Sequence, residues 1–233
     1  MRFTYRAIVA YDGSRYCGFS LQPGERTVES VLLAALQPIV PELPRIACGG
    51  RTDRGVHATA QALSFYAREA LACDTIASAL DAADPDYLTV REVRRVPNHF
   101  HASFSAIGRR YVYLHPEDVD VVRIDAMLRA LVGVRCFSAF ARDTPSGANT
   151  VRRLFAASAS RALEGIRFDF HASGFLRRQV RVMVATALRE ALRESPTDVL
   201  VELAARGDRR ATAPSAAAEN LYLVGIDYLP FGV

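Results

Sequence analysis

A short polar segment flanked by glycines, Gly49–Ala58, carries the residue types that a reaction would need. Its glycines allow the backbone to turn sharply and to approach a ligand closely. Asp53 stands between Arg51 and Arg54, and a guanidinium beside a carboxylate favours the ionised form. An ionised, oriented carboxylate can act as a nucleophile or as a general base. On spacing alone, the commoner interpretation is a structural turn in which Asp53 caps backbone N–H groups.

The cysteines point neither to a metal site nor to a disulfide framework. Cys17, Cys48, Cys73 and Cys136 are widely scattered and form no C-x-x-C pair or Cys/His cluster. The apolar runs fall short of the roughly 20 residues of a membrane span, and no apolar signal follows Met1. We therefore expect a cytoplasmic protein with reduced thiols, no metal and no contact with a membrane.

The positive charge of the chain comes from arginine. All 29 basic residues are Arg, and the formal net charge is +4. Residues 1–105 hold as many acidic side chains as arginines, so the excess lies in residues 106–233. A GC-rich genome can produce this composition by itself. The planar guanidinium of arginine also binds phosphate with two N–H groups, better than lysine does, and it stacks on nucleic-acid bases. The excess of arginine therefore points weakly to an anionic partner of the second half.

Apolar periodicity predicts the order β-α-β-β-α-β for residues 1–105 and a similar order for residues 106–233. We therefore expect an α+β fold of two ferredoxin-like halves, resembling RNA-recognition modules, with antiparallel sheets joined around a central cleft. The predicted strands are Phe3–Tyr11, Arg45–Cys48, Gln61–Tyr66, Leu88–Val96, Arg109–Leu114, Thr150–Ala159, Ile166–Ala172 and Leu221–Leu229. The first predicted helix begins after the cap Thr27, and the last begins at Ser195-Pro196-Thr197-Asp198. The other predicted helices are Asp74–Ala83, Val121–Val132 and Leu176–Arg193.

The glycine-flanked segment resembles the active-site motif of the TruA-type tRNA pseudouridine synthases. Its matching residues are Gly50-Arg51-Thr52-Asp53-x-Gly55-Val56-His57-Ala58. Further blocks resemble the family in the same order along nearly the whole chain. They are Tyr11-Asp12-Gly13-Ser14-x-Tyr16-x-Gly18-Phe19, Thr27-Val28-Glu29, Phe100-His101-Ala102-x-Phe104-Ser105-Ala106-x-x-Arg109-Arg110-Tyr111-x-Tyr113, Asn149-Thr150-Val151-Arg152, Gly174-Phe175-Leu176 with Val180-Arg181, and Leu221-Tyr222-Leu223-Val224.

This resemblance implies a reaction and a partner. The reaction is the isomerisation of uridine to pseudouridine in the tRNA anticodon stem-loop, around nucleotide positions 38–40. The N-glycosidic bond breaks, the uracil turns, and C5 reattaches to the sugar without a cofactor or a metal. The family is typically a homodimer in which both subunits hold one tRNA, so we expect tRNA and a second copy of this chain as partners.

The resemblance also assigns roles to four residues. Asp53 matches the catalytic aspartate, and Arg51 matches the arginine that fills the stack vacated by the extruded uridine. Tyr111 matches the tyrosine that stacks on the flipped base, whereas Tyr113, on the same strand face, is a possible core residue. Arg181 matches a helix-borne residue that pairs with the catalytic carboxylate.

Further arginines are candidate contacts to RNA phosphates. Arg177 and Arg178 lie one helical turn before Arg181 in the predicted helix, so all three can share a face. His57 is expected to be a structural hydrogen-bonding residue, although it could serve as a base. The candidate phosphate contacts are Arg54, Arg109, Arg110, Arg177 and Arg178.

Two other functions compete with the isomerase. One is an RNA-binding or RNA-folding protein without turnover, which would keep the arginine-rich surface but would not need Asp53 in a glycine loop. The other is a hydrolase that uses Asp53 and His57 and releases free uracil or cleaves the strand.

Overall fold

The computed structural model describes residues 2–117, 119–145 and 147–230. It divides into two compact units. The first unit contains the chain up to Ile107 and the C-terminal segment that begins at Tyr222, and the second unit runs from Gly108 to Leu221. The segment from Tyr222 onward was predicted in the second half. It belongs to the first unit because its strand pairs in parallel with the strand that begins at His57.

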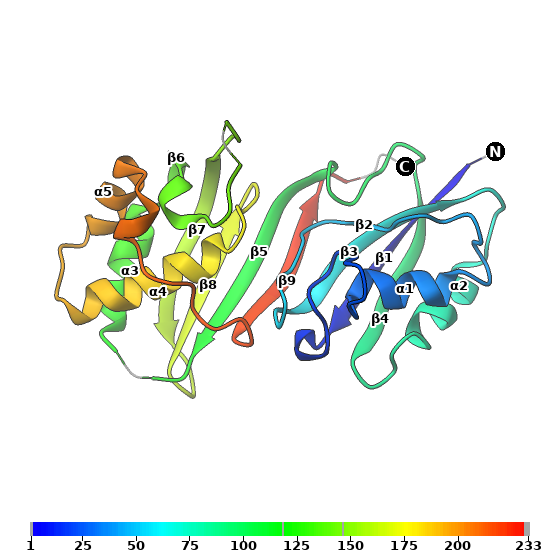
Figure 1. The fold of residues 1–233 in the computed structure, drawn as a ribbon, viewed down its shortest axis with the longest axis horizontal. Helices are drawn as coiled ribbons and strands as arrows, with labels where there is room; N and C mark the ends of the chain where they lie inside the picture. Colours follow the sequence, from blue (N-terminus) through cyan, green and yellow to red (C-terminus); the bar gives the residue numbers. More distant parts are fainter. Residues whose placement is uncertain (1, 118, 146, 231–233) are drawn as a thin grey trace. The chain divides into compact units, whose positions relative to one another are not determined.

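In its described residues, the first unit has helices α1 and α2 over a sheet (Figure 1). Strand β3 lies between β1 and both β2 and β9, and β4 pairs with the far side of β1. Helices α1 and α2 pack against each other, and α2 packs on β4. The elements are β1 (Phe3–Tyr11), the short 3₁₀ turn η1 (Gly13–Arg15), α1 (Val28–Leu36), β2 (Ala47–Cys48), β3 (His57–Ala67), α2 (Cys73–Asp81), β4 (Leu88–Val96) and β9 (Leu221–Tyr228).

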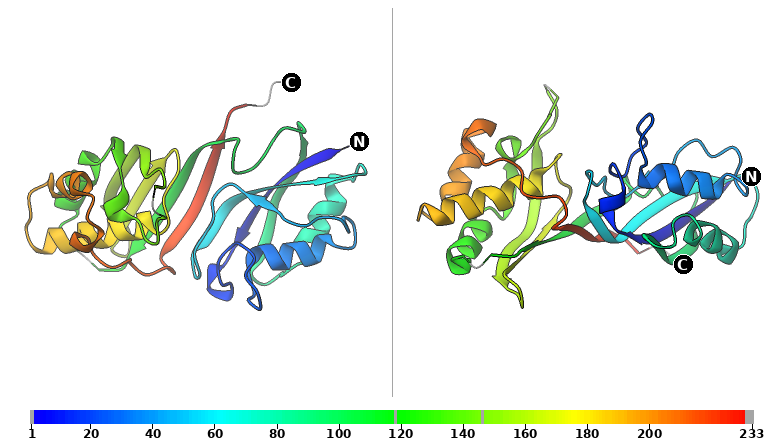
Figure 2. Two further views of the ribbon diagram at one scale, coloured as in Figure 1. Left: turned by 45° about the horizontal axis from the view of Figure 1, so that its top comes forward. Right: turned by 60° about the horizontal axis from the view of Figure 1, so that its bottom comes forward.

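In the part of the second unit that the structure describes, helices α3, α4 and α5 lie on one side of the strands (Figure 2). Its strand order is β5-β8-β7-β6, and every pair in it is antiparallel. The elements are β5 (Ala106–His115), α3 (Val121–Ala130), β6 (Gly133–Cys136), the 3₁₀ turn η2 (Ser138–Phe140), β7 (Val151–Arg161), β8 (Ile166–Ala172), α4 (Gln179–Leu192), α5 (Val199–Arg206) and the 3₁₀ turn η3 (Arg209–Ala211). The chain thus has the predicted mixed α+β fold with mainly antiparallel pairing.

Two local predictions are confirmed in detail. Thr27 caps α1, because its side chain accepts the backbone N–H of Ser30 while the Ser30 hydroxyl accepts the N–H of Thr27. Strand β8 alternates as predicted, with Phe168 and Phe170 buried in the core of the second unit. Both signals depend only on neighbouring residues, which is why the sequence alone reveals them.

Three predictions in the second unit are wrong. Strand β6 was not predicted; it begins at Gly133, which has a φ of 123°, and all of its residues pair with β7. Helix α4 begins at Gln179 and not at Leu176, because Arg178 takes a left-handed φ of 60°. Helix α5 begins at Val199, because the hydroxyl of the predicted cap Ser195 instead donates to Glu190.

Candidate active site

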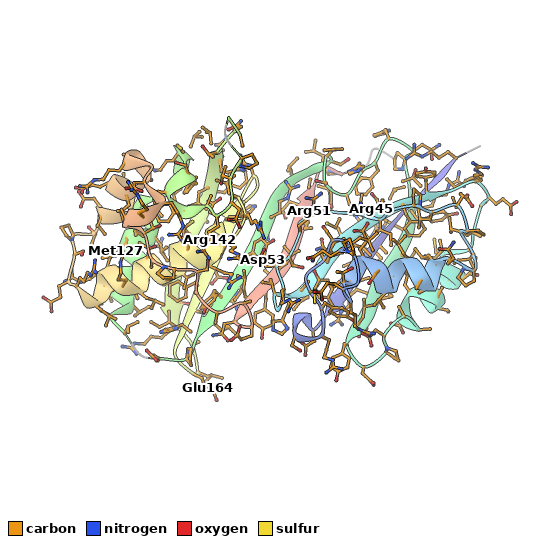
Figure 3. The ribbon with its side chains drawn as sticks, in the orientation of Figure 1. Arg45, Arg51, Asp53, Met127, Arg142 and Glu164 are labelled. Carbon is orange, nitrogen blue, oxygen red and sulfur yellow. The ribbon has the colours of Figure 1, made fainter. Side chains whose placement is uncertain are left out.

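The glycine-flanked segment forms the loop between β2 and β3 (Figure 3). Arg51 is exposed on this loop, whereas Asp53 is partly buried. The Asp53 carbonyl accepts the N–H of Val56 at 3.1 Å, and Gly55 between them has a φ of 81°. A left-handed φ strongly favours glycine, so the turn that holds Asp53 depends on Gly55. We call Gly49–Val56 the Asp53 loop.

A buried polar cluster holds the Asp53 loop from below. The amide of Gln61 donates to the Gly50 carbonyl at 2.6 Å and accepts the Gly50 N–H at 3.3 Å. The Tyr11 hydroxyl lies 2.8 Å from the Thr52 hydroxyl and accepts from the Gln61 amide at 3.4 Å. Burial raises the pKa of Tyr11 well above its usual range, so this phenol stays neutral in the cluster. The loop is therefore fixed on both sides of Arg51.

The segment after β1 packs backbone against backbone on the Asp53 loop. The Thr52 carbonyl accepts the N–H of Phe19 at 3.1 Å. A Cβ added to Gly18 would lie 2.9 Å from the Thr52 carbonyl oxygen, and one added to Gly13 would lie 2.0 Å from the Val56 carbonyl oxygen. Such contacts exclude any side chain at these two glycines. These two glycines thus act by allowing a close approach of the backbone to the Asp53 loop.

His57 links the same two segments from the side. Its Nδ1 lies 3.2 Å from the N–H of Gly13 and 3.1 Å from the Asp12 carboxylate, and its ring stacks on Tyr222 of β9. Hydrogen bonds from Ser14, together with the charges of His57 and Arg15, lower the pKa of Asp12. These contacts confirm the prediction that His57 is a structural hydrogen-bonding residue.

Arg54 is the third charged residue of the Asp53 loop and contacts the neighbouring segment. Its guanidinium lies 3.3 Å from the Glu25 carboxylate and 2.9 Å from Cys17 Sγ. The Arg54 side chain is nevertheless 70% exposed. An exposed ion pair of this kind stabilises little and leaves the guanidinium accessible to a larger anion.

A buried carboxylate, Glu29, fixes the base of α1 close to this loop. Its side chain is only 2% exposed and pairs with Arg45 at 2.7 Å. Its two oxygens also accept the N–H groups of Leu21 and Ile46. Glu29 therefore ties the helix to the segment that enters β2, and this contact explains why a charged residue is buried there.

The second unit contains Tyr111 and Tyr113 on β5. Tyr113 is buried edge-on against Phe168, at 6.1 Å between ring centroids, and burial raises its pKa. Tyr111 contacts Phe175, in the segment before α4, at 5.3 Å and an interplanar angle of 88°. Tyr111 is buried as well, at 7% exposure against 2% for Tyr113, so both rings pack within the second unit and the choice of Tyr111 as the base-stacking residue stays a prediction.

Arg181 and its neighbours lie differently from the prediction. Arg181 is in the first turn of α4, where its Nε donates to the Ala216 carbonyl at 2.7 Å. Arg177 and Arg178 precede α4, so they do not share a helical face with Arg181, because the left-handed residue Arg178 interrupts the helix. Arg177 forms an ion pair with Asp143 at 3.0 Å.

The last two candidate arginines lie on β5. Arg109 Nη1 donates to the Ser173 carbonyl at 2.7 Å, which gives this side chain a contact within the unit. Arg110, the next residue, is exposed. Adjacent residues of a strand point to opposite faces, so the side chains of Arg109 and Arg110 do not serve one site.

The structure groups the candidates by unit. Asp53, Arg51 and Arg54 share one loop of the first unit, and Tyr111 and Arg181 belong to the second. Sequence reasoning missed the clamp made by Tyr11, Thr52 and Gln61. Its only sequence signal is Gln61, a polar residue at the start of a predicted strand. The structure shows that Gln61 is fully buried.

Comparison with known proteins decides the family. A family model described as tRNA pseudouridine synthase matches residues 7–105 and 127–229. The chain belongs to this family. It is 34% identical over 96% of its length to tRNA pseudouridine synthase A of Geobacillus kaustophilus, of which it covers 93%. It is 32% identical to the Lacticaseibacillus casei protein of the same name, over 96% of this chain and 99% of that one. The Caulobacter protein of that name is 34% identical, over 96% and 97%.

As a pseudouridine synthase, the chain is an isomerase. Within the described ranges, no three His, Cys, Asp or Glu side chains gather as ligands for a metal ion. Every helix of those ranges is too short or too polar to cross a bilayer.

Proposed function

We propose that this chain converts uridine to pseudouridine in the anticodon stem-loop of tRNA, at positions 38–40, and that Asp53 is its catalytic residue. The observation that carries the proposal is the Asp53 loop, which Gln61 holds at the Gly50 backbone and Tyr11 holds at the Thr52 hydroxyl, directly before the partly buried Asp53. A loop held in this way keeps its carboxylate in one orientation, as a positioned nucleophile or base requires.

The chemistry conserves the composition of the substrate, although the hydrogen on C5 is released to solvent. The C1′–N1 bond breaks, the uracil rotates, and a C1′–C5 bond forms. C5 then loses its proton, and N1 gains one. Asp53 can assist by attacking the sugar, by attacking the base, or by removing a sugar proton, since each role uses a single carboxylate. No cofactor enters this balance, in agreement with what the family resemblance implies.

Three further residues complete the proposed site. Arg51, exposed on the Asp53 loop, replaces the stacking that the extruded uridine leaves behind. Tyr111 stacks on the uracil, and its edge contact with Phe175 fixes the ring. Arg181, held at its Nε by the Ala216 carbonyl, serves as the ionic partner of the catalytic carboxylate.

RNA contacts, assembly and location follow from the same proposal. The residues that we propose as contacts to RNA phosphates are Arg54, Arg109, Arg110, Arg177 and Arg178. We also propose that the chain acts on tRNA as a homodimer in the cytoplasm. We also propose that each unit is a ferredoxin-like half. The antiparallel order β4-β1-β3-β2 in the first unit supports this.

The test uses unmodified tRNA transcript tritiated at uracil C5. We expect release of tritium without change of mass in the product, and pseudouridine at positions 38–40 when the modified residues are mapped. Binding without release would favour the RNA-binding protein without turnover. Free uracil or a cleaved strand would favour the hydrolase.

A further inference from the structure

Two arginines of the second unit lie together without a compensating carboxylate. Arg142 follows η2, and Arg209 begins η3, which packs against η2. Among residues 2–117, 119–145 and 147–230, neither side chain has an ion-pair partner. The nearby carboxylates are engaged elsewhere, since Asp143 pairs with Arg177 and Asp208 pairs with Arg210. The positive electrostatic potentials of Arg142 and Arg209 therefore add.

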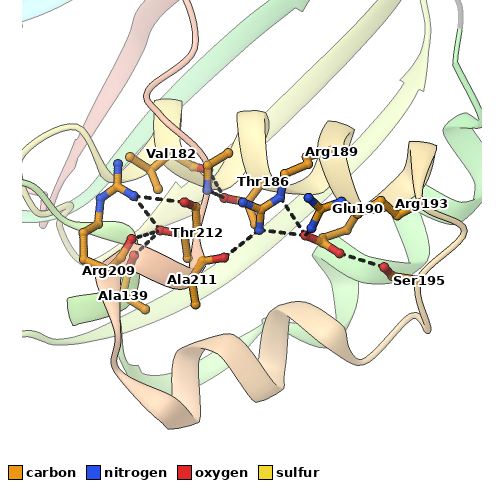
Figure 4. Close-up of polar contacts among 11 residues, drawn as sticks. Ala139, Val182, Thr186, Arg189, Glu190, Arg193, Ser195, Arg209, Ala211 and Thr212 are labelled. Carbon is orange, nitrogen blue, oxygen red and sulfur yellow. Dashed lines mark hydrogen bonds and ion pairs between the residues drawn. The ribbon is translucent and has the colours of Figure 1, made fainter.

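Arg209 is held rigidly (Figure 4). Its Nη1 donates to the Thr212 hydroxyl at 2.7 Å, and this hydroxyl donates to the Ala139 carbonyl at 2.7 Å. Its Nε is buried and has no hydrogen-bond partner in the described part of the chain. Burial, followed by the like charges of Arg142 and Arg189, lowers the pKa of Arg209. A guanidinium fixed in such surroundings lacks the counter-charge that would normally accompany it.

A third arginine nearby shows the contrast. Arg189 on α4 lies 2.7 Å from the carboxylate of Glu190, and its Nη2 donates to the Ala211 carbonyl at 2.6 Å (Figure 4). Glu190 is almost fully buried and also accepts from Ser195. Glu190, which also pairs with Arg193 at 3.5 Å, thus gives Arg189 a counter-charge within the unit, whereas Arg142 and Arg209 have no such partner among the described residues.

The start of α4 adds to the same positive field. The N–H of Arg142 donates to the Arg177 carbonyl at 3.1 Å, which places Arg142 beside the segment that leads into α4. This 14-residue helix begins at Gln179 without a side-chain cap. The aligned peptide dipoles of this helix place partial positive charge at its N-terminal end, which favours an anion there.

We propose that Arg142 and Arg209 form a binding site for a backbone phosphate of the substrate RNA. Guanidinium groups present paired N–H donors that match phosphate oxygens. A single bound phosphodiester would supply the missing counter-charge to both arginines. The inference rests on the proposed function for the identity of the anion, and it adds two residues that the family motifs did not indicate.

Arg142 is the residue to test. Arg209 holds Thr212, so its replacement would disturb the fold, whereas Arg142 is exposed. The dissociation constant for unmodified tRNA transcript should be measured in 50 to 300 mM NaCl for wild type, Arg142→Ala and Arg142→Glu. We expect Arg142→Ala to weaken binding about fivefold at 150 mM salt and to reduce the slope of log K against log salt by about one. Arg142→Glu should have the larger effect.

Arg206→Ala is the matched control, because Arg206 is an exposed arginine of the same unit that pairs with Glu202. It should change neither the affinity nor the slope. If both Arg142 variants bind like wild type while wild type releases tritium, the phosphate site is refuted and the proposed function stands. If the slope falls but wild type releases no tritium, the proposed isomerisation fails and the RNA site remains.

Discussion

The close approach of Gly18 to the Asp53 loop gives a sharp prediction. Gly18 has a φ of 92°, and an added Cβ would meet the Thr52 oxygen at 2.9 Å, the Arg54 nitrogen at 3.3 Å and the Asp53 carbonyl carbon at 3.3 Å. All three atoms are backbone, so alanine at this position would have to displace the loop itself. Gly18→Ala therefore changes the position of Asp53 without altering any catalytic side chain.

Gly24 provides the control, because it lies in the same segment with a φ of 73° and has no neighbour within 4 Å of an added Cβ. Both substitutions carry the left-handed penalty of about 1 kcal/mol. Only Gly18→Ala adds overpacking, which costs about 1–3 kcal/mol more. A misplacement of about 1 Å at a reacting group lowers turnover about a hundredfold.

The assay combines urea unfolding with single-turnover tritium release from tRNA labelled at uracil C5. We expect Gly24→Ala to lose about 1 kcal/mol of unfolding free energy and to keep its rate. Gly18→Ala should lose about 2–4 kcal/mol and react roughly a hundredfold more slowly under conditions where it is still folded. Equal rates for the two folded variants would refute the argument that this contact sets the position of Asp53.

Further predictions concern other contacts. Tyr111→Ala should slow turnover about tenfold to a hundredfold with little loss of tRNA affinity, whereas Tyr111→Phe should keep most of the rate; equal loss of rate and affinity would contradict the stacking role. Arg177→Ala combined with Arg178→Ala should weaken tRNA binding and flatten its salt dependence, and an unaltered slope would assign both residues to another surface. Burial raises the pKa of Glu190. Hydrogen bonds from Ser195 and Arg189 and the charges of Arg189 and Arg193 outweigh this effect, so the pKa of Glu190 is lowered. Its stabilisation is therefore present above its usual pKa and is lost as pH falls. Glu190→Gln should cost about 3 kcal/mol at pH 7, and its difference from wild type in urea titrations should shrink on acidification, not grow.

The sequence predicts the fold where the signal is local. The alternation of Ile166–Ala172 and the cap at Thr27 depend on near neighbours and hold in the structure. The start of α5 was misplaced because Ser195 has a competing partner, Glu190. Strand β3 is longer than predicted, since its pairing with β1 continues to Ala58 opposite Tyr11. Such long-range contacts leave no periodic trace in the sequence.

The same distinction applies to the candidate site. The glycine motif marked Asp53 as a candidate but by itself favoured a structural turn, and the family resemblance assigned the roles of Asp53 and its neighbours. The clamp under the loop could not be predicted, because the contact between Tyr11 and Thr52 joins residues 41 positions apart in the chain. Arg142 and Arg209 of the second unit are still further apart in the chain, and their proximity becomes visible only when η2 and η3 pack together.

The most direct test of the account is the chemical step of Asp53→Asn. Single-turnover tritium release at saturating tRNA should be compared for wild type, Asp53→Asn and Asp86→Asn, an exposed acid between α2 and β4. We expect Asp53→Asn to bind tRNA as tightly as wild type but to release tritium at least about a thousandfold more slowly, and Asp86→Asn to match wild type. Tritium release by Asp53→Asn within a few-fold of wild type would contradict the assignment of Asp53 as the catalytic residue.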